Sequence, residues 1–192
     1  GRLGAEQALP ILIDAPLGGA TEDLEGHIEA VAGVGAKAVP RLIETLRGKD
    51  ATTGANVVAA LVRIGGPSVQ PLIEAVGGSY PEVRNAAKRA LAQIGTPAIE
   101  PLIHSLLRDE RFEVRRSALD ILRQIGESQV VTALIQALKD SDPGVRAYAT
   151  RYLGELGDAQ AVPALVEVVG SHESPHLRSL AIDSLGALRD PQ

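Results

Sequence analysis

The chain has 192 residues, of which 45% are hydrophobic and 22% are charged, and this composition excludes a disordered tail and a collagen-like rod. It contains no cysteine, which excludes a disulfide scaffold, a thiolate zinc site and a cysteine nucleophile. The net charge of −5 arises in residues 1–35, where one basic residue stands against six acidic ones, so the rest of the chain offers no strongly basic footprint for a nucleic acid.

Internal repetition is the strongest pattern in the sequence. An apolar residue followed by glycine recurs at Ile64-Gly65, Ile94-Gly95, Ile125-Gly126 and Leu156-Gly157, with spacings of 30, 31 and 31 residues. A fixed period of this length is typical of repeat architectures. The chain therefore divides into six repeats, at about 1–35, 36–65, 66–95, 96–126, 127–157 and 158–188.

The first two repeats depart from the pattern of the others. Later repeats have an apolar residue followed by arginine in mid-period, but repeat one has Asp23-Leu24 at that place and repeat two has Thr53-Gly54. The segment Pro16-Leu17-Gly18-Gly19 loosens the turn of repeat one. We expect repeat one to be irregular or to act as a cap.

Each later repeat predicts two helices joined by a polar turn. In the fourth repeat the first helix is predicted over 99–107, and the second has apolar residues at helical spacing from Val114 to Ile125. In the fifth repeat the first helix is predicted over 131–138, and Asp142-Pro143 supplies the N-cap and first residue of the second.

Prolines and glycines mark the predicted helix ends. Prolines are expected near the first turn of the first helices, at Pro10, Pro40, Pro71, Pro101 and Pro163. Left-handed glycines are expected to end the second helices, at Gly95, Gly126 and Gly157.

A helix pair of about 31 residues cannot bury its own apolar face, so successive repeats must stack. A column of small residues in the second helices would let them approach closely, and it consists of Ala87, Ala118, Ala149 and Ala181. The sequence therefore predicts an all-α, right-handed α-solenoid, a superhelix of six two-helix repeats that forms one domain over 1–192.

At these positions the sequence resembles the HEAT-repeat family, in a short form similar to the repeats of phycobilisome lyases. The matching segments are Ala-Val-Pro-Ala-Leu-Val at 161–166, Asp-Pro-Gly-Val-Arg at 142–146 and Leu-Gly-Glu-Leu-Gly at 153–157. The resemblance implies that the second helices line the concave side of the array. It leaves the function open, because such arrays serve scaffolds, lyase subunits and nucleic-acid proteins alike.

One motif suggests a metal site, but its context argues against that interpretation. His172-Glu173-Ser174-Pro175-His176 matches the H-E-x-x-H signature of zinc proteases, which requires a continuous helix. Pro175 would interrupt that helix, and Ser174 is expected to cap a helix that starts after it. The other histidines, His27 and His104, occupy different repeat positions. We therefore predict no metal, no cofactor and no catalytic residue.

An arginine ladder recurs once per repeat in the first turn of the second helix, at Arg84, Arg115, Arg146 and Arg178. It could be an anion-binding strip. The favoured interpretation is structural, with each guanidinium paired to turn acids such as Asp109 and Asp140 or to helix carbonyls.

A second charged column alternates in sign, and ion pairs between adjacent repeats are expected along it, at Arg89, Asp120, Arg151 and Asp183. A modest basic patch is also predicted over repeats three and four, from Lys88, Arg89, Arg115, Arg116 and Arg123.

These patterns favour a non-enzymatic scaffold that binds a partner protein or peptide on the concave surface. The candidate partner-binding residues are Asn85, Lys88, Arg89, Arg116, Asp120, Arg123, Arg151, Glu155 and Asp183. An alternative is a subunit of a phycobilin lyase or another chromophore-handling enzyme, and a weaker one is nucleic-acid binding through the basic patch.

No apolar run approaches the roughly 18 residues of a membrane helix, and no signal-peptide pattern is present. We therefore expect no membrane partner and a cytoplasmic location. The chain begins at Gly1 and contains no methionine, so we expect it to be cut from a longer protein or array.

Overall fold

The computed structural model describes residues 24–48, 51–126, 130–171 and 174–189. These residues form helices and turns without a strand among them, so the predicted all-α solenoid is confirmed. The chain divides into two compact units, Gly1–Ala98 and Ile99–Gln192, and each is treated by itself. That the repeats form one domain stays a prediction.

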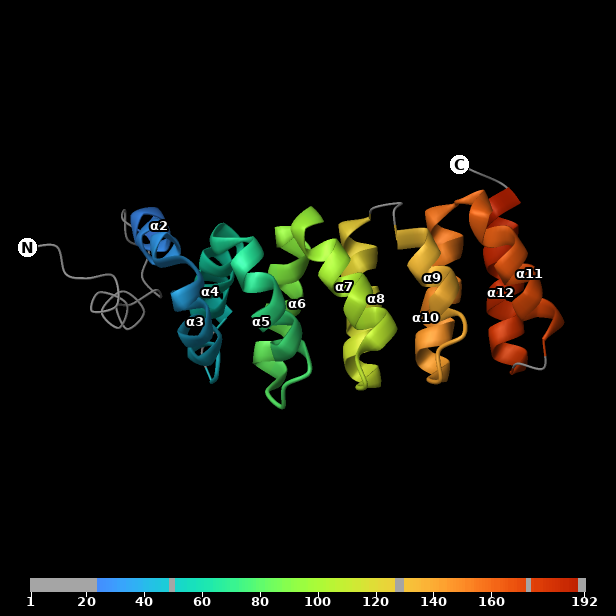
Figure 1. The fold of residues 1–192 in the computed structure, drawn as a ribbon, viewed down its shortest axis with the longest axis horizontal. Coiled ribbons are helices and arrows are strands. Elements are labelled where there is room, and N and C mark those ends of the chain that lie inside the picture. Colours follow the sequence, from blue (N-terminus) through green and yellow to red (C-terminus); the bar gives the residue numbers. More distant parts are fainter. Residues whose placement is uncertain (1–23, 49–50, 127–129, 172–173, 190–192) are drawn as a thin grey trace, which may run out of the picture. The chain divides into compact units, whose positions relative to one another are not determined.

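The first unit contains the second helix of repeat one and the pairs of repeats two and three. Its elements are α2 (Leu24–Val34), the 3-10 turn η1 (Gly35–Ala38), α3 (Val39–Thr45), α4 (Ala51–Ile64), α5 (Gly66–Val76) and α6 (Pro81–Ile94). Second helices stack on second helices, because α4 packs against both α2 and α6 (Figure 1). First helices stack likewise, with α3 against α5.

The second unit repeats this arrangement. The helix α7 (Thr96–Arg108) crosses the boundary between the units, and the elements after it are α8 (Phe112–Ile125), α9 (Val131–Ala137), α10 (Pro143–Leu156), η3 (Ala159–Ala161), α11 (Val162–Gly170) and α12 (Pro175–Arg189). The helix α10 packs against α8, α9 and α12, and α11 packs against α12 (Figure 1). None of the helices in the described ranges is long and apolar enough to span a membrane.

The core of each unit is aliphatic and follows the repeat. Leu61 and Leu91 of the first unit, like Leu122 and Leu153 of the second, are fully buried at equivalent places in the second helices. Each such side chain contributes about 1.5–3 kcal/mol when it leaves water. The alanine column is buried as predicted, since Ala87, Ala118, Ala149 and Ala181 are each at most 1% exposed.

One glycine allows an especially close helix contact. A Cβ atom at Gly154 of α10 would lie 2.7 Å from the Cβ and Oγ atoms of Ser184 on α12. The hydroxyl of Ser184 donates a hydrogen bond of 3.0 Å to the carbonyl of Thr150. The missing side chain at position 154 therefore lets α12 approach the backbone of α10.

Two of the predicted left-handed glycines are confirmed and one prediction is wrong. Gly126 (φ 77, ψ 21) and Gly157 (φ 71, ψ 11) end their helices in the left-handed region. Gly95 has φ 71 but ψ −132, and Gly65 has almost the same angles. The reason is that α5 and α7 begin at the next residue, so a single glycine must reverse the chain in a conformation closed to other residues.

The prolines also divide into two groups. Pro40 and Pro163 lie in the first turn of α3 and α11, as predicted. Pro71 and Pro101 lie inside α5 and α7, so the prediction is wrong for them, because both helices begin several residues early. The turn that stands apart as η1 or η3 in other repeats is joined to the helix there. Pro10 lies outside the described residues.

Candidate partner-binding surface

Five of the predicted partner-binding residues lie in two rows on adjacent helices. Arg116, Asp120 and Arg123 share one face of α8 at positions i, i+4 and i+7, and Arg151 and Glu155 share one face of α10. Since α8 packs against α10, the rows are neighbours. We define the second-helix face as Glu113, Arg116, Asp120 and Arg123 of α8 with Tyr148, Arg151 and Glu155 of α10.

An arginine–tyrosine cluster, defined as Arg116, Tyr148 and Arg151, joins the two rows. The Nη2 group of Arg116 donates a hydrogen bond of 2.9 Å to the hydroxyl of Tyr148. The guanidinium carbons of Arg116 and Arg151 lie 4.7 and 4.9 Å from the centroid of the Tyr148 ring, which is cation–π distance. The hydrogen bond and positive charge of Arg116 lower the pKa of Tyr148.

Tyr148 was missed by the sequence analysis. It lies 32 residues after Arg116, and Glu155 lies at the same offset from its partner Arg123. The available signal was an aromatic residue about one repeat beyond a charged one, in a chain with three tyrosines and one phenylalanine. The offset between neighbouring side chains is one residue more than the repeat, and only the packing of α8 on α10 shows it.

The ion pairs of the face differ from the predicted column. Arg123 lies 3.8 Å from a carboxylate oxygen of Asp120 and 3.7 Å from one of Glu155, and Arg151 lies 3.9 Å from Glu155. No ion pair joins Arg151 to Asp120 or Asp183 among the residues that the structure describes. The expected pairing along the column is therefore wrong here, because residues one period apart are not the closest side chains.

The remaining predicted partner-binding residues lie elsewhere. Asn85 and Arg89 are exposed on α6 of the first unit, and Lys88 beside them is half-buried. Asp183 is exposed on α12 of the second unit. The three residues of α6 share one side of their helix, and they belong to a different unit from the second-helix face.

The arginine ladder donates hydrogen bonds to the turns that precede α6, α8 and α10. Arg84 donates to the carbonyl of Gly78 at 3.0 Å, six residues upstream. Arg146 donates to the carbonyls of Asp140 and Ser141 at 2.8 and 3.1 Å. Arg178 is half-buried at the equivalent place in α12. The bonds from Arg84 and Arg146 satisfy carbonyl groups in the turns before α6 and α10.

Arg115 adds a nearly buried ion pair to this pattern. Arg115 donates hydrogen bonds to the backbone carbonyls of Asp109 and Glu110. It also donates one hydrogen bond to each carboxylate oxygen of Asp140, at 2.7 and 2.8 Å. The two side chains are 11% and 10% exposed. Burial is the largest single influence on the pKa of Asp140 and raises it, but the hydrogen bonds from Arg115 and from the amide of Asp142, together with the charges of Arg115 and Arg146, lower that pKa overall. The hydrogen bonds to Asp140 raise the pKa of Arg115.

The basic patch is weaker than predicted. Arg115 cannot contribute to it, because its charge is buried against Asp140. Arg123 is balanced by Asp120 and Glu155. Lys88 and Arg89 belong to the first unit and Arg116 to the second.

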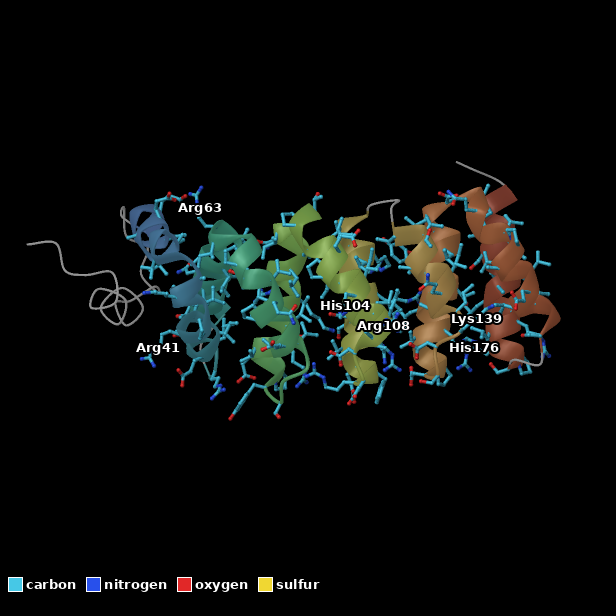
Figure 2. All side chains as sticks on the ribbon, viewed as in Figure 1. Arg41, Arg63, His104, Arg108, Lys139 and His176 are labelled. Carbon is cyan, nitrogen blue, oxygen red and sulfur yellow. The ribbon has the colours of Figure 1, made fainter. Side chains whose placement is uncertain are left out.

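The last three residues of the histidine motif, Ser174 to His176, form the start of a helix. Ser174 accepts a hydrogen bond of 3.2 Å from the amide of Leu177, which confirms that it caps α12, and Pro175 is the first residue of that helix. His172 and Glu173 lie outside the described residues, and nothing is described for the side chain of His27. His104 and His176 lie on separate helices (Figure 2). Within the described ranges no cluster of three or more metal-binding residue types occurs.

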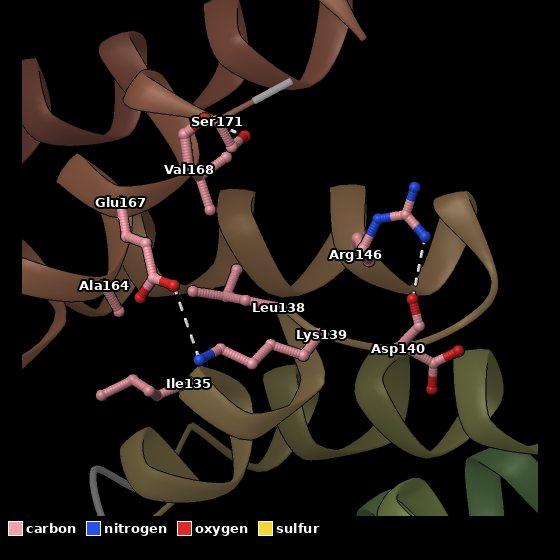
Figure 3. A pocket seen from close by; sticks show the side chains of 9 residues that line it. All are labelled: Ile135, Leu138, Lys139, Asp140, Arg146, Ala164, Glu167, Val168 and Ser171. Carbon is pink, nitrogen blue, oxygen red and sulfur yellow. Dashed lines mark hydrogen bonds and ion pairs between the residues drawn. The ribbon is translucent and has the colours of Figure 1, made fainter. Parts of the chain in front are cut away.

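A cavity of about 500 Å³ lies between α9, α10 and α11 (Figure 3). Ile135, Leu138 and Val168 form its apolar wall. Lys139 and Glu167 form an ion pair of 3.6 Å between the two first helices. Apart from Arg146 of the ladder, its lining contains none of the predicted site residues.

Comparison with known proteins places this repeat architecture in a family. A family model described as HEAT repeats matches residues 69–143 and 131–192. The chain belongs to the HEAT-repeat family. Among curated protein sequences, none matches this HEAT-repeat chain significantly.

Two solved structures share the fold of this HEAT-repeat chain. One is the complex of CpcE and CpcF of phycocyanin lyase from Nostoc sp. PCC7120, with 22% identity, a TM-score of 0.54, and coverage of 78% of this chain and 98% of that one. The other is the Pds5-Scc1 complex, with 14% identity, a TM-score of 0.54, and coverage of 85% of this chain and 30% of that one. At these identities the likeness concerns the fold alone.

Proposed function

We propose that this HEAT-repeat chain is a non-enzymatic scaffold that binds a partner protein or peptide on its second helices. The observation that carries this proposal is the second-helix face, on which Arg116, Tyr148 and Arg151 hold one another in place. Side chains that are already ordered lose less conformational entropy when a partner binds. Arginine and tyrosine are also enriched among residues that dominate binding energy.

The comparisons support the same proposal at a coarser level. Both similar structures were solved as complexes, CpcE with CpcF and Pds5 with Scc1. A stacked array of helix pairs presents a long, largely pre-formed surface, which suits protein binding. The role proposed for the face is contact by ion pairs and stacking, without a chemical step.

The proposal is tested by capture of a partner from the native source with immobilised wild-type chain and with the double variant R116E/R123E. We expect the double variant to capture less of the partner, because charge reversal turns attraction into repulsion. Its melting temperature should stay close to that of the wild type, since exposed ion pairs contribute about 0–1 kcal/mol each.

The matched control reverses two exposed cations of the same unit outside the second-helix face, in R108E/K139E. Arg108 is the last residue of α7, and Lys139 lies in the turn that follows α9 (Figure 2). The control changes the net charge equally and should retain capture. Equal capture by wild type and R116E/R123E would remove the face from the proposed function.

A second candidate is a subunit of a phycobilin lyase, which is favoured by the likeness to one chain of the CpcE and CpcF complex. If it is correct, the purified chain should take up a bilin and gain visible absorbance. A chain that stays colourless after gel filtration with bilin would exclude this candidate.

A further inference from the structure

We infer that the arginine–tyrosine cluster receives a carboxylate from an acidic segment of the partner. This inference rests on the proposed function and names the chemistry of the segment that would contact Arg116. The occupant is a peptide segment with an isolated Asp or Glu side chain between neutral residues.

The first step is the state of Arg116. Its side chain is exposed, and its polar contact is the 2.9 Å bond to the hydroxyl of Tyr148. Among the described residues, no carboxylate lies within ion-pair distance of it, in contrast to Arg123 with its two acidic neighbours. A guanidinium has five N–H donors, so most of those of Arg116 are available to a ligand.

The second step is preorganisation. The ring of Tyr148 lies under the guanidinium at 4.7 Å from its carbon, which restricts a side chain that otherwise has many rotamers. A planar guanidinium held in this way offers parallel donors that match both oxygens of a carboxylate. The Arg116 side chain therefore loses less conformational entropy when a carboxylate binds than a surface arginine without such a contact would lose.

The third step is the charge of the surroundings, which decides between a short acidic segment and a polyanion. The second-helix face carries three arginines and three carboxylates, and the acids are Glu113, Asp120 and Glu155. Glu113 and Asp120 lie one turn on either side of Arg116. A nucleic acid needs cations along a run of phosphates, and these carboxylates would repel it. One carboxylate flanked by neutral residues fits the pattern of the face.

The other cluster residues support this contact. Arg151 lies over the same ring, with its guanidinium carbon 4.9 Å from the centroid, and adds a second positive charge to the cluster. Its carboxylate neighbour, Glu155, is shared with Arg123. The hydroxyl of Tyr148 accepts from Arg116 and retains its own hydrogen for a carbonyl or carboxylate of the segment.

The test is titration of the isotope-labelled chain with a short capped peptide of Gly, Ser and Ala that has a single central Glu. NMR cross-peaks of backbone amides and arginine Nε groups report weak binding site by site. We expect the peaks of Arg116, Tyr148 and Arg151 to shift with the Glu peptide and to stay unchanged with the Gln analogue. Equal shifts with both peptides would overturn the inference.

Variants distinguish a specific role of the stacked Arg116 guanidinium from a general effect of positive charge on peptide binding. R116Q should lower the affinity of the chain for the Glu peptide about tenfold, because the hydrogen bonds from the charged guanidinium are lost. R116K should restore only part of the affinity, because lysine lacks the planar fork. The matched control R108Q removes one exposed charge from α7 and should bind like the wild type. Equal weakening by R116Q and R108Q would overturn the inference.

The outcomes distinguish this inference from the proposed function. If partner capture depends on Arg116 and Arg123 but the Glu peptide shifts no cluster peak, the inference of an acidic segment is wrong and the proposed scaffold function stands. If the Glu peptide binds at Arg116 but capture is insensitive to R116E/R123E, carboxylate binding by the cluster stands, but the second-helix face is removed from the proposed function. Displacement of the Glu peptide by single-stranded DNA at physiological salt, with tighter binding of the DNA, would overturn the inference in favour of a polyanion.

Discussion

Arg115 and Asp140 join neighbouring repeats through a bidentate, nearly buried ion pair. Arg115 also donates hydrogen bonds to the backbone carbonyls of Asp109 and Glu110. R115M should lower the free energy of unfolding by about 3 kcal/mol, because Asp140 would remain as a buried charge without its partner. Urea unfolding measures this difference.

The control for R115M is R111M. Arg111 pairs with Asp109 at 2.9 Å, but its side chain is 48% exposed. Its removal should therefore cost less than about 1 kcal/mol. Equal destabilisation by the two variants would contradict the role given to burial.

Tyr152 makes the stability of the fold sensitive to alkaline pH. Its hydroxyl donates a 2.7 Å hydrogen bond to the carbonyl of Leu122, and burial raises the pKa of Tyr152 to about 12 from 10.0. Since the folded state keeps the proton longer than the unfolded chain, the contribution is complete below pH 10 and is lost as the pH rises to about 12.

The variant Y152F separates the two effects of this hydroxyl. At neutral pH it should be less stable by about 1 kcal/mol, because the hydrogen bond is lost. Between pH 10 and pH 12 its unfolding free energy should fall less steeply than that of the wild type. If urea unfolding gives parallel pH profiles for Y152F and the wild type, the loss of stability at alkaline pH does not come from the Tyr152 hydroxyl.

At the scale of the helices, the contact of α10 with α12 depends on an absent side chain. G154A would place a Cβ atom 2.7 Å from Ser184, so α12 must shift. We expect a loss of about 1–3 kcal/mol, as for overpacking in other cores. Thermal unfolding followed by circular dichroism measures it.

Gly186 provides the matched comparison for G154A, since it lies in α12 and a Cβ atom there would meet nothing within 4 Å. G186A should stabilise the chain by up to about 1 kcal/mol, because alanine is the better helix former. Destabilisation of similar size at both glycines would show that the close approach is not the cause.

The last helix pair exposes side chains at places that are buried in earlier repeats. Ile182 is 56% exposed, but Leu119, which follows the alanine column at the same place two repeats earlier, is 1% exposed. Val162 and Val131 differ in the same way, at 36% and 3%. In the described part of the chain, no repeat stacks on this side of α11 and α12.

These exposures predict unequal costs for equivalent substitutions. L119A should lower the free energy of unfolding by about 2–5 kcal/mol, because it leaves a cavity in the core. I182A should change it by about 0.5 kcal/mol or less. Chemical denaturation of the two variants measures the difference, and similar losses would mean that Ile182 is covered in solution.

At the scale of the whole molecule, charge separates the remaining functional alternatives. The net charge is −5, and cations and carboxylates are equally numerous on the second-helix face. We therefore expect the chain to pass through a heparin column at physiological salt, since binding to a polyanion such as heparin or a nucleic acid needs an excess of cations on the protein surface. Retention that R116E/R123E abolishes would instead support nucleic-acid binding.

Much of the helical framework could be predicted from spacing within the sequence. The alanine column follows from the repeat period, and the caps formed by Asp142 and Ser174 follow from residues a few positions apart. The early starts of α5 and α7 were missed, because the turn that precedes them has the same sequence signals whether or not it joins the helix.

The candidate site was predicted only in part. Arg116, Arg123 and Glu155 were identified because they share exposed helical positions, and the pairing of the arginine ladder with Asp140 was expected. Tyr148 was missed, and Arg115 was also counted in a basic patch that its buried ion pair rules out. The partners of Tyr148 and Arg115 lie in the neighbouring repeat. The offset that brings such residues together depends on how α10 packs on α8 and not on any local pattern.

By itself, the sequence determined the repeat period, the all-α architecture and the buried positions, because these depend on the apolar spacing within each helix pair. The tertiary structure decided which charges are neutralised and which stay available: Arg115 is buried against Asp140, and Arg116 is stacked on Tyr148 without a carboxylate among its described neighbours. The reason is physical. Side chains at equivalent repeat positions differ in their surroundings only after the helices pack, and packing sets distances that the order of residues does not.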